Sequence, residues 1–218
     1  MKAIFKARDE GLFHIAAFLV PAIGLMLFGS MLHWSLMLLG AVCFALAIFT
    51  MYFFRDPNRA VPNDPKSVVS PADGTVVGIE DMLSTPHYDG PCKRVSVFLS
   101  VFNVHINRSP FDGIVKSITY KPGKFLNAMG SNTSDLNEAN TIRMQTDSGP
   151  MTVRQISGLI ARRIICKAEV GEILAKGEKF GMIKFGSRTE LYLPMDAEIC
   201  VTLKEIVKGG ESVVARFQ

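Results

Sequence analysis

The stretch GEILAKGEKFGMIKFG, from Gly171 to Gly186, places glycines between short groups of apolar residues. Because glycine has no Cβ and closes tight turns at little steric cost, this spacing indicates very short strands joined by sharp turns. Such an arrangement is typical of a small β-barrel or β-sandwich. The stretch therefore predicts a mainly β domain around it.

The segments on both sides of this stretch extend the β pattern, and no long amphipathic helix or internal repeat interrupts them. A linker rich in Pro, Asn and Asp, residues 56–74, precedes them. The polar segment Ser131–Asn140 is expected to form a mobile loop near the functional site. We expect a mainly β (α+β) domain, residues 55–218, with strands in Gly74–Ile79, Arg94–Val101, Gly113–Tyr120, Met151–Ile156, Ala161–Cys166 and Glu190–Phe217.

Two apolar runs occupy the N-terminus, Gly11–Leu32 and Ser35–Phe54, with only His33 and Trp34 between them. Each run is close to the ~20 residues that a helix needs to cross a bilayer. Pro21 is expected to kink the first helix without breaking it. We therefore expect a transmembrane helical hairpin in the first 54 residues.

The apolar runs have two other interpretations. A secretory signal peptide fits poorly, because a second apolar run follows and no small-residue cleavage site is evident. A hairpin embedded in one leaflet stays open. Basic residues flank both runs and are missing from the turn, so the positive-inside rule predicts that both ends, and the domain, face the cytoplasm. These basic residues are Lys2, Lys6, Arg8, Arg55, Arg59 and Lys66.

Composition narrows the class of function. The net charge of +4 is mild and the basic residues are scattered, which does not indicate a nucleic-acid partner. The four cysteines lack C-x-x-C spacing, so neither a disulfide framework nor a metal site is expected. Free cysteines agree with a reducing compartment.

The Gly186-Ser187 pair directly follows the glycine-rich stretch. A serine hydroxyl can attack the preceding carbonyl if a base takes its proton and a donor stabilises the oxyanion. The amide becomes an ester, and elimination with hydrolysis then turns the serine into a pyruvoyl group. Most Gly-Ser pairs are ordinary turns, so this pair gains meaning only from the motifs that accompany it.

Several segments together resemble the phosphatidylserine decarboxylase family, and most closely its short branch with a Phe-Gly-Ser motif. They occur in the family's order and cover nearly all of the domain. They are Phe54–Pro57 with Ser70–Gly74, Phe98–Arg108, Gly123–Ala128, and Gln155–Cys166 with Gly181–Arg188.

The resemblance implies a membrane-bound proenzyme that cuts itself between Gly186 and Ser187. It implies a β chain of residues 1–186 and an α chain of residues 187–218 that stay associated, the second beginning with a pyruvoyl group made from Ser187. The implied activity converts phosphatidylserine to phosphatidylethanolamine at the cytoplasmic membrane. The pyruvoyl carbonyl would serve as the electron sink when CO₂ leaves.

The family's Asp-His-Ser triad corresponds here to Asp73, His105 and Ser187. His105 would deprotonate Ser187, and Asp73 would orient the histidine, although an Asp-Gly pair is also the preferred sequence of a plain β-turn. Longer relatives carry a second histidine three residues before the one matched by His105, where this chain has Phe102. The group that protonates the carbanion after CO₂ loss is therefore left open.

Four residues are candidates for substrate binding. Arg162 and Arg163 stand in an apolar strand, where alternation sends them to opposite faces, and one guanidinium would suit a phosphate or carboxylate. Lys124 and Phe102 are further pocket candidates, and Lys124 is equally plausible as a turn residue.

The sequence also allows other functions. A membrane-tethered biotinyl- or lipoyl-like adaptor would need a lysine displayed at a hairpin tip, and none stands out. A serine hydrolase with the same three residues would keep an intact chain. An archaetidylserine decarboxylase of the same family, acting on ether lipids, stays open, as does a homo-oligomer.

Overall fold

The computed structural model describes residues 7–127, 134–159, 163–184 and 186–218. It divides into two compact units, one ending at Pro57 and the other running from Asn58 to Gln218.

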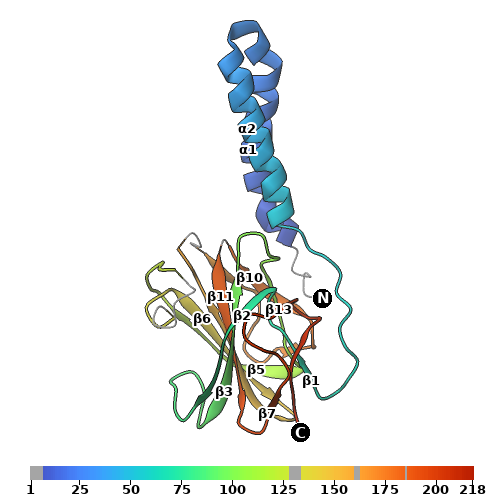
Figure 1. Cartoon of the computed structure of the whole chain (residues 1–218), viewed down its shortest axis with the longest axis vertical. Helices are drawn as coiled ribbons and strands as arrows, with labels where there is room; N and C mark the ends of the chain where they lie inside the picture. Colours follow the sequence, from blue (N-terminus) through green and yellow to red (C-terminus); the bar gives the residue numbers. More distant parts are fainter. Residues whose placement is uncertain (1–6, 128–133, 160–162, 185) are drawn as a thin grey trace. The chain divides into compact units, whose positions relative to one another are not determined.

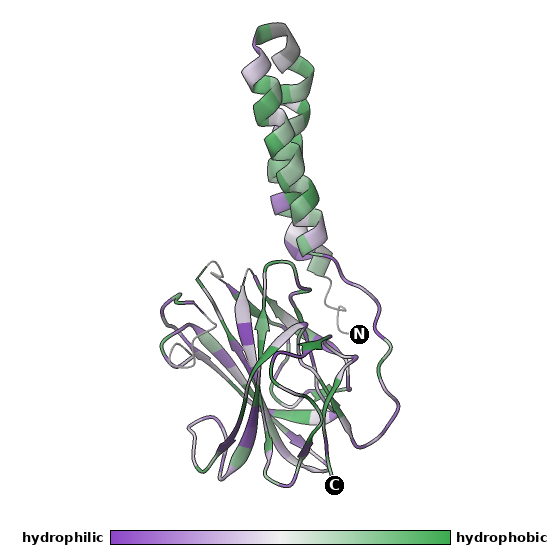
Figure 2. Cartoon of the chain, in the orientation of Figure 1, coloured by the Kyte–Doolittle hydropathy of each residue, from purple (hydrophilic) through white to green (hydrophobic). Residues whose placement is uncertain are grey.

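The N-terminal unit is a helical hairpin of α1 (Ala7–Leu32) and α2 (Trp34–Phe53). Both helices are long and apolar enough to cross a membrane, and apolar colours dominate them in Figure 2. Only His33 separates them, capping α2 by accepting a hydrogen bond from the Ser35 N–H at 3.3 Å. Trp34, expected in the turn, is instead the first residue of α2. The helices pack closely, since a Cβ added to Gly40 would lie 3.1 Å from the Leu25 Cβ.

The second unit is mainly β, as the sequence predicted, and is built around a curled eight-stranded antiparallel sheet (Figure 1). Its strands, in spatial order, are β13 (Ile206–Val207), β2 (Gly74–Met82), β3 (Cys92–Leu99), β11 (Ser187–Pro194), β7 (Gly149–Ile156), β6 (Ala139–Thr146), β5 (Gly113–Lys121) and β9 (Ile173–Leu174).

Two three-stranded sheets complete this half-barrel. The first pairs β1 (Ser67–Val69), β14 (Val213–Arg216) and β12 (Glu198–Ile199), and the second pairs β4 (Ile106–Arg108), β10 (Lys179–Ile183) and β8 (Ile164–Cys166).

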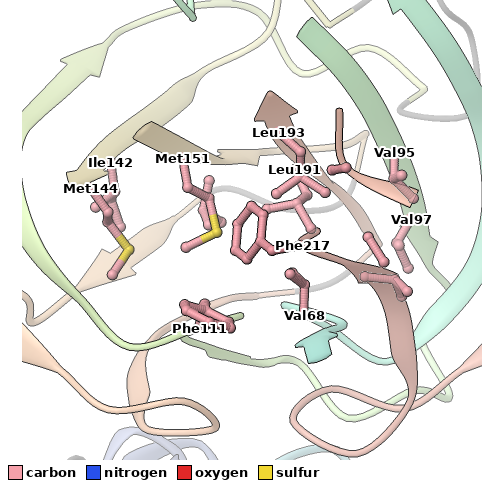
Figure 3. Packing of buried hydrophobic residues seen from close by; sticks show 14 of the residues in the cluster. Val68, Val95, Val97, Phe111, Ile142, Met144, Met151, Leu191, Leu193 and Phe217 are labelled. Carbon is pink, nitrogen blue, oxygen red and sulfur yellow. The ribbon is translucent and has the colours of Figure 1, made fainter. Parts of the chain in front are cut away.

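The hydrophobic core lines one face of the large sheet (Figure 3). Phe111 and Phe217 meet edge to face in it, with ring centroids 4.9 Å apart. The register aligns apolar residues on successive strands, so side chains on one face pack across the sheet. This row contains Val95, Leu191, Val153, Ile142 and Ile118.

Three sequence expectations need correction. The polar segment Ser131–Asn140 was expected to be a loop, but Ala139 and Asn140 open strand β6. The strand expected to end at Val101 stops at Leu99, where a turn begins. The strand expected from Ala161 is β8, which begins at Ile164, and residues 160–162 lie outside the described residues.

Candidate active site

Ser187 is the first residue of β11, the strand that lies between β3 and β7 within the large sheet. Its side chain is fully buried, and its hydroxyl has no hydrogen-bond partner among the described residues. Side chains alternate along a strand, so Ser187 shares a face of β11 with Thr189 and the core residue Leu191. A buried hydroxyl without a partner is costly to retain and is typical of a functional group.

Gly186 gives the residue before Ser187 an unusual backbone. Its φ is +54°, in the left-handed region that favours glycine. An added Cβ would meet no atom within 4 Å, so space alone does not require glycine here. The glycine is therefore explained by backbone conformation, at the peptide bond where self-cleavage was expected.

His105 is buried just before β4, in the sheet whose central strand β10 leads into the Gly186-Ser187 turn. Its carbonyl accepts a hydrogen bond from the Ile183 N–H at 3.2 Å. Its Nδ1 lies 2.9 Å from the Asn103 carbonyl oxygen. Because a carbonyl can only accept, Nδ1 carries the proton, and in the neutral ring Nε2 is the basic nitrogen.

A chain of buried amides fixes the segment after His105 against β11. Asn107 donates to Thr189 Oγ1 at 3.2 Å. Gln155 in turn donates to Asn107 Oδ1 at 2.8 Å, and Asn140 donates to Gln155 Oε1 at 2.9 Å. Ser187 comes two residues before Thr189 on β11, so alternation places its side chain on the same face as this linked residue.

Asp73 has different partners from those expected. Its carboxylate accepts two hydrogen bonds from Arg59 Nη2, at 2.8 and 2.7 Å, and one from the Gly209 N–H at 2.8 Å. The structure thus joins Asp73 to Arg59 and Gly209 rather than to His105. Both carboxylate oxygens accept from this one nitrogen, and both side chains are largely buried, so the charge-assisted contact is well shielded from water.

The motif around Asp73 also holds the C-terminal part of the chain. The Ser70 N–H donates to the Ser212 carbonyl, and the Gly210 N–H donates to the Ser70 carbonyl, each at 2.8 Å. Arg59 also contacts Glu211 at 3.4 Å. Residues on both sides of the Gly186-Ser187 bond are therefore joined here, as well as along β11, which pairs with β3 over its whole length.

A buried ionic cluster anchors β11 on its other face. Glu190 is fully buried and lies 3.1 Å from Arg188 Nε and 3.3 Å from Arg154 Nη1, and it accepts a hydrogen bond from the Tyr192 hydroxyl at 2.7 Å. Burial by itself raises the pKa of Glu190, but Arg188, the Tyr192 hydroxyl and Arg154 outweigh it and hold that pKa below its ordinary value.

Glu190→Gln is expected to lower the free energy of unfolding by about 3–5 kcal/mol, because it removes the buried carboxylate that faces both Arg188 and Arg154. Since the folded pKa of Glu190 is depressed, its contribution is complete above its ordinary pKa of 4.5 and is lost as the pH falls below that value. Thermal unfolding from pH 7 to pH 3 measures both effects. A variant as stable as the parent would contradict the role of the cluster.

The remaining sequence candidates lie at the domain surface. Phe102 is exposed in the turn after β3, and Lys124 is exposed in the segment after β5. The Arg163 side chain is exposed, and its carbonyl accepts the Lys184 N–H at 3.2 Å. Arg162 lies outside the described residues.

Two open pockets, of about 470 and 280 Å³, lie over β5, β6 and β7. Arg154 and Thr152, which help to line them, point to the face of β7 opposite the core residue Val153. Because Ser187 is on the core side, these pockets are separate from the candidate site.

Sequence reasoning missed three residues that organise the site: Asn103, Asn107 and Arg59. The first two lie inside the segment Phe98–Arg108, which had already been singled out. Arg59 was noted only for its charge, and its pairing with Asp73 over fourteen positions has no local sequence signal.

Fold and site together define a β half-barrel with a buried serine after a left-handed glycine and a buried histidine beside the same turn. A family model described as phosphatidylserine decarboxylase matches residues 46–215. The chain belongs to the phosphatidylserine decarboxylase family.

Three relatives illustrate the similarity, and each is named phosphatidylserine decarboxylase proenzyme. The protein from Gluconacetobacter diazotrophicus is 49% identical over 173 residues, which cover 78% of this chain and 77% of the relative. The Syntrophus aciditrophicus protein is 46% identical over 172 residues, covering 78% and 80%. The Citrifermentans bemidjiense protein is 40% identical over 206 residues, covering 94% of each chain.

Proposed function

We propose that this protein is a self-processing, pyruvoyl-dependent decarboxylase that converts phosphatidylserine to phosphatidylethanolamine in phospholipid biosynthesis. Family membership and the names of its relatives support the reaction. The observation that carries the proposal is the buried Ser187 hydroxyl directly after a left-handed Gly186. The relatives' designation as proenzymes agrees with a chain that must be cut before it works.

Maturation would proceed at this one peptide bond. A base takes the Ser187 hydroxyl proton, Oγ attacks the Gly186 carbonyl carbon, and the C–N bond breaks as nitrogen gains a proton, which leaves an ester. Loss of the Ser187 α-proton and of the Gly186 carboxylate leaves dehydroalanine. Addition of water and release of ammonia then leave a pyruvoyl group on the α chain, residues 187–218.

Ser187 fits this group because its side chain is enclosed and its hydroxyl has no hydrogen-bond partner among the described residues. The pyruvoyl group supplies a ketone that binds the substrate amine and withdraws electrons as CO₂ leaves. His105 is proposed as the base that accepts the Ser187 proton at Nε2, since Nδ1–H is held by the Asn103 carbonyl.

Asp73 is proposed as a positioning residue for His105, following the family's triad. Its bond to the Gly209 N–H, on the α chain, supports an additional role in joining the β and α chains after cleavage, and Arg59, which holds Asp73, also contacts Glu211 of the α chain. The position of β11 between β3 and β7 also supports β and α chains that stay associated after cleavage.

Lys124, Phe102, Arg162 and Arg163 are proposed to meet the substrate. Phe102 and Arg163 belong to segments that leave the sheet next to Ser187, and their exposure suits contact with a lipid head group. A guanidinium fork matches the phosphate or carboxylate of phosphatidylserine.

The direct test is purification of the full chain and reaction with phosphatidylserine in mixed micelles. Two polypeptides are expected, the smaller blocked to Edman sequencing and reactive with a carbonyl reagent, together with release of CO₂ and phosphatidylethanolamine. A single intact chain that is fully active would overturn the proposal.

The hairpin is proposed to hold the enzyme at the cytoplasmic membrane with both ends in the cytoplasm, because basic residues flank both apolar runs. Reporter fusions at the N-terminus and after Arg59 are expected to be active on the cytoplasmic side alone. A fusion placed at His33 is the matched control and should report the opposite side if the hairpin spans the bilayer. Reporters at the two ends that lie on opposite sides would contradict a hairpin.

A further inference from the structure

The segments around the candidate site leave the large sheet at the same end of its strands. The register pairs Ser187 at the start of β11 with Leu99 at the end of β3. It also pairs Ile156 at the end of β7 with Ala139 at the start of β6. Ala139 in turn pairs with Lys121 at the end of β5. The segments after β3, β5 and β7 therefore leave the sheet at the strand ends next to Ser187.

These three segments expose large apolar side chains. Phe102 is 65% exposed, Phe125 38%, Leu136 52% and Leu159 67%. We call these four residues the apolar rim. Single exposed apolar residues are ordinary, and others occur elsewhere on the domain, but these four share the segments that leave the sheet at the strand ends next to Ser187.

Cations accompany the apolar rim. Lys124 and Arg163 are exposed on the same segments. The exposed acid among them, Asp135, already contacts Arg154 at 3.3 Å. Phe and Leu next to Lys and Arg are the composition of surfaces that enter the boundary between head groups and acyl chains, above all in anionic membranes.

We propose that the apolar rim is a membrane-docking surface of the catalytic domain, with an anionic lipid bilayer as its occupant. The inference rests on the proposed function to the extent that phosphatidylserine is itself an anionic membrane lipid. Docking through the apolar rim brings Ser187 to the head-group layer, so that the substrate's serine reaches the site while its acyl chains stay in the bilayer. None of the rim residues belongs to the hairpin, so the two membrane contacts can be tested separately.

Tryptophan quenching in the full chain tests the contact. Trp34 is the only tryptophan in the sequence, and it is replaced by Phe in every variant. Leu136→Trp and Leu159→Trp are then compared, in proteoliposomes containing phosphatidylserine, with and without lipids brominated near the top of the acyl chains.

The matched control is Leu83→Trp. Leu83 is 87% exposed and follows Met82, which pairs with Cys92 at the opposite ends of the strands. Residues that enter the boundary at a depth of ~5–10 Å are expected to lose about half of their emission or more, and the control little. Equal quenching at all three positions, or none at the two rim positions, overturns the proposal.

Kinetics give a second measurement. The double variant Leu136→Ser/Leu159→Ser is expected to raise KM for phosphatidylserine in vesicles by about tenfold, because burying even one leucine is worth a factor of this order. Its kcat and its activity toward a monomeric short-chain phosphatidylserine should match the parent, as should those of Leu83→Ser. An unchanged KM in vesicles overturns docking.

The outcomes separate docking from the reaction itself and from another partner. A chain that is quenched at the apolar rim but releases no CO₂ would refute the decarboxylase function and leave docking standing. Rim emission that depends on protein concentration and not on brominated lipid would show that a second copy of the chain covers the apolar rim, and would overturn the proposal.

Discussion

Ser187→Ala is expected to leave the chain at full length and without decarboxylase activity. The alanine has no oxygen to attack the Gly186 carbonyl, and no pyruvoyl group can form from it. The structure adds that Ser187 is enclosed at the start of a fully paired strand, so the change removes only one atom from a fixed backbone. The variant should therefore fold and accumulate. Intact mass and CO₂ release measure the two losses together.

Ser148→Ala is the matched control for this loss. Ser148 is an exposed serine in the turn between β6 and β7, at the end of these strands opposite the end where Ser187 lies. This control should be processed into two chains and should keep its activity. Two chains from Ser187→Ala, or decarboxylation by its single chain, would refute the assignment of Ser187.

Much of the β domain could be predicted from sequence, because most strands place apolar residues on the core face at every second position. Strand β6, Ala139–Thr146, was not predicted at all, and its first two residues were assigned to a loop for a physical reason. Asn140 is polar but buried, and its amide is satisfied by Gln155, a residue of the neighbouring strand. Local pattern assigns such a residue to a loop, since its hydrogen-bond partner is not visible in the sequence.

The candidate site also has a part that could be predicted from the sequence and a part that could not. Gly186 and Ser187 were found because their chemistry is local to one peptide bond. The bond from Asp73 to Arg59 was not found, because pairing between a linker and a turn depends on the fold. Glu190 has the sequence pattern of a solvent-facing residue, yet Ser134 covers it, donating to its carboxylate at 3.0 Å.

His105→Ala is expected to slow self-cleavage by ~10²–10⁴-fold, the usual effect of losing a general base. Ser187 is a poor nucleophile until its proton is removed, and the Asn103 carbonyl fixes the His105 ring so that Nε2 is its basic nitrogen. Uncut chain should accumulate over hours at neutral pH. The measurement is the fraction of cut chain against time, with His87→Ala as the control histidine. His87 lies 3.4 Å from Asp135 and lines, with Arg154, the pocket on the face of the sheet opposite Ser187, so its loss should leave the processing rate unchanged.

Asp73→Asn should slow processing less than His105→Ala, since an aspartate acting through a histidine orients it and stabilises its cation. Arg59→Gln separates this role from the bond between chains. If Asp73 acts on His105, Asp73→Asn slows cleavage while Arg59→Gln chiefly weakens the association of the cut chains in denaturant. If Asp73 acts only by binding Arg59, both variants show the same change.

The decisive outcome concerns when His105 is needed. Slow cleavage in His105→Ala, followed by normal turnover of whatever chain is cut, would confine the histidine to maturation. Loss of both would give His105 a second step, return of a proton to the substrate carbon after CO₂ leaves, at a position where Phe102 offers no second imidazole. Normal cleavage with lost decarboxylation would refute His105 as the maturation base, because a ring required to deprotonate Ser187 cannot be dispensable before turnover begins.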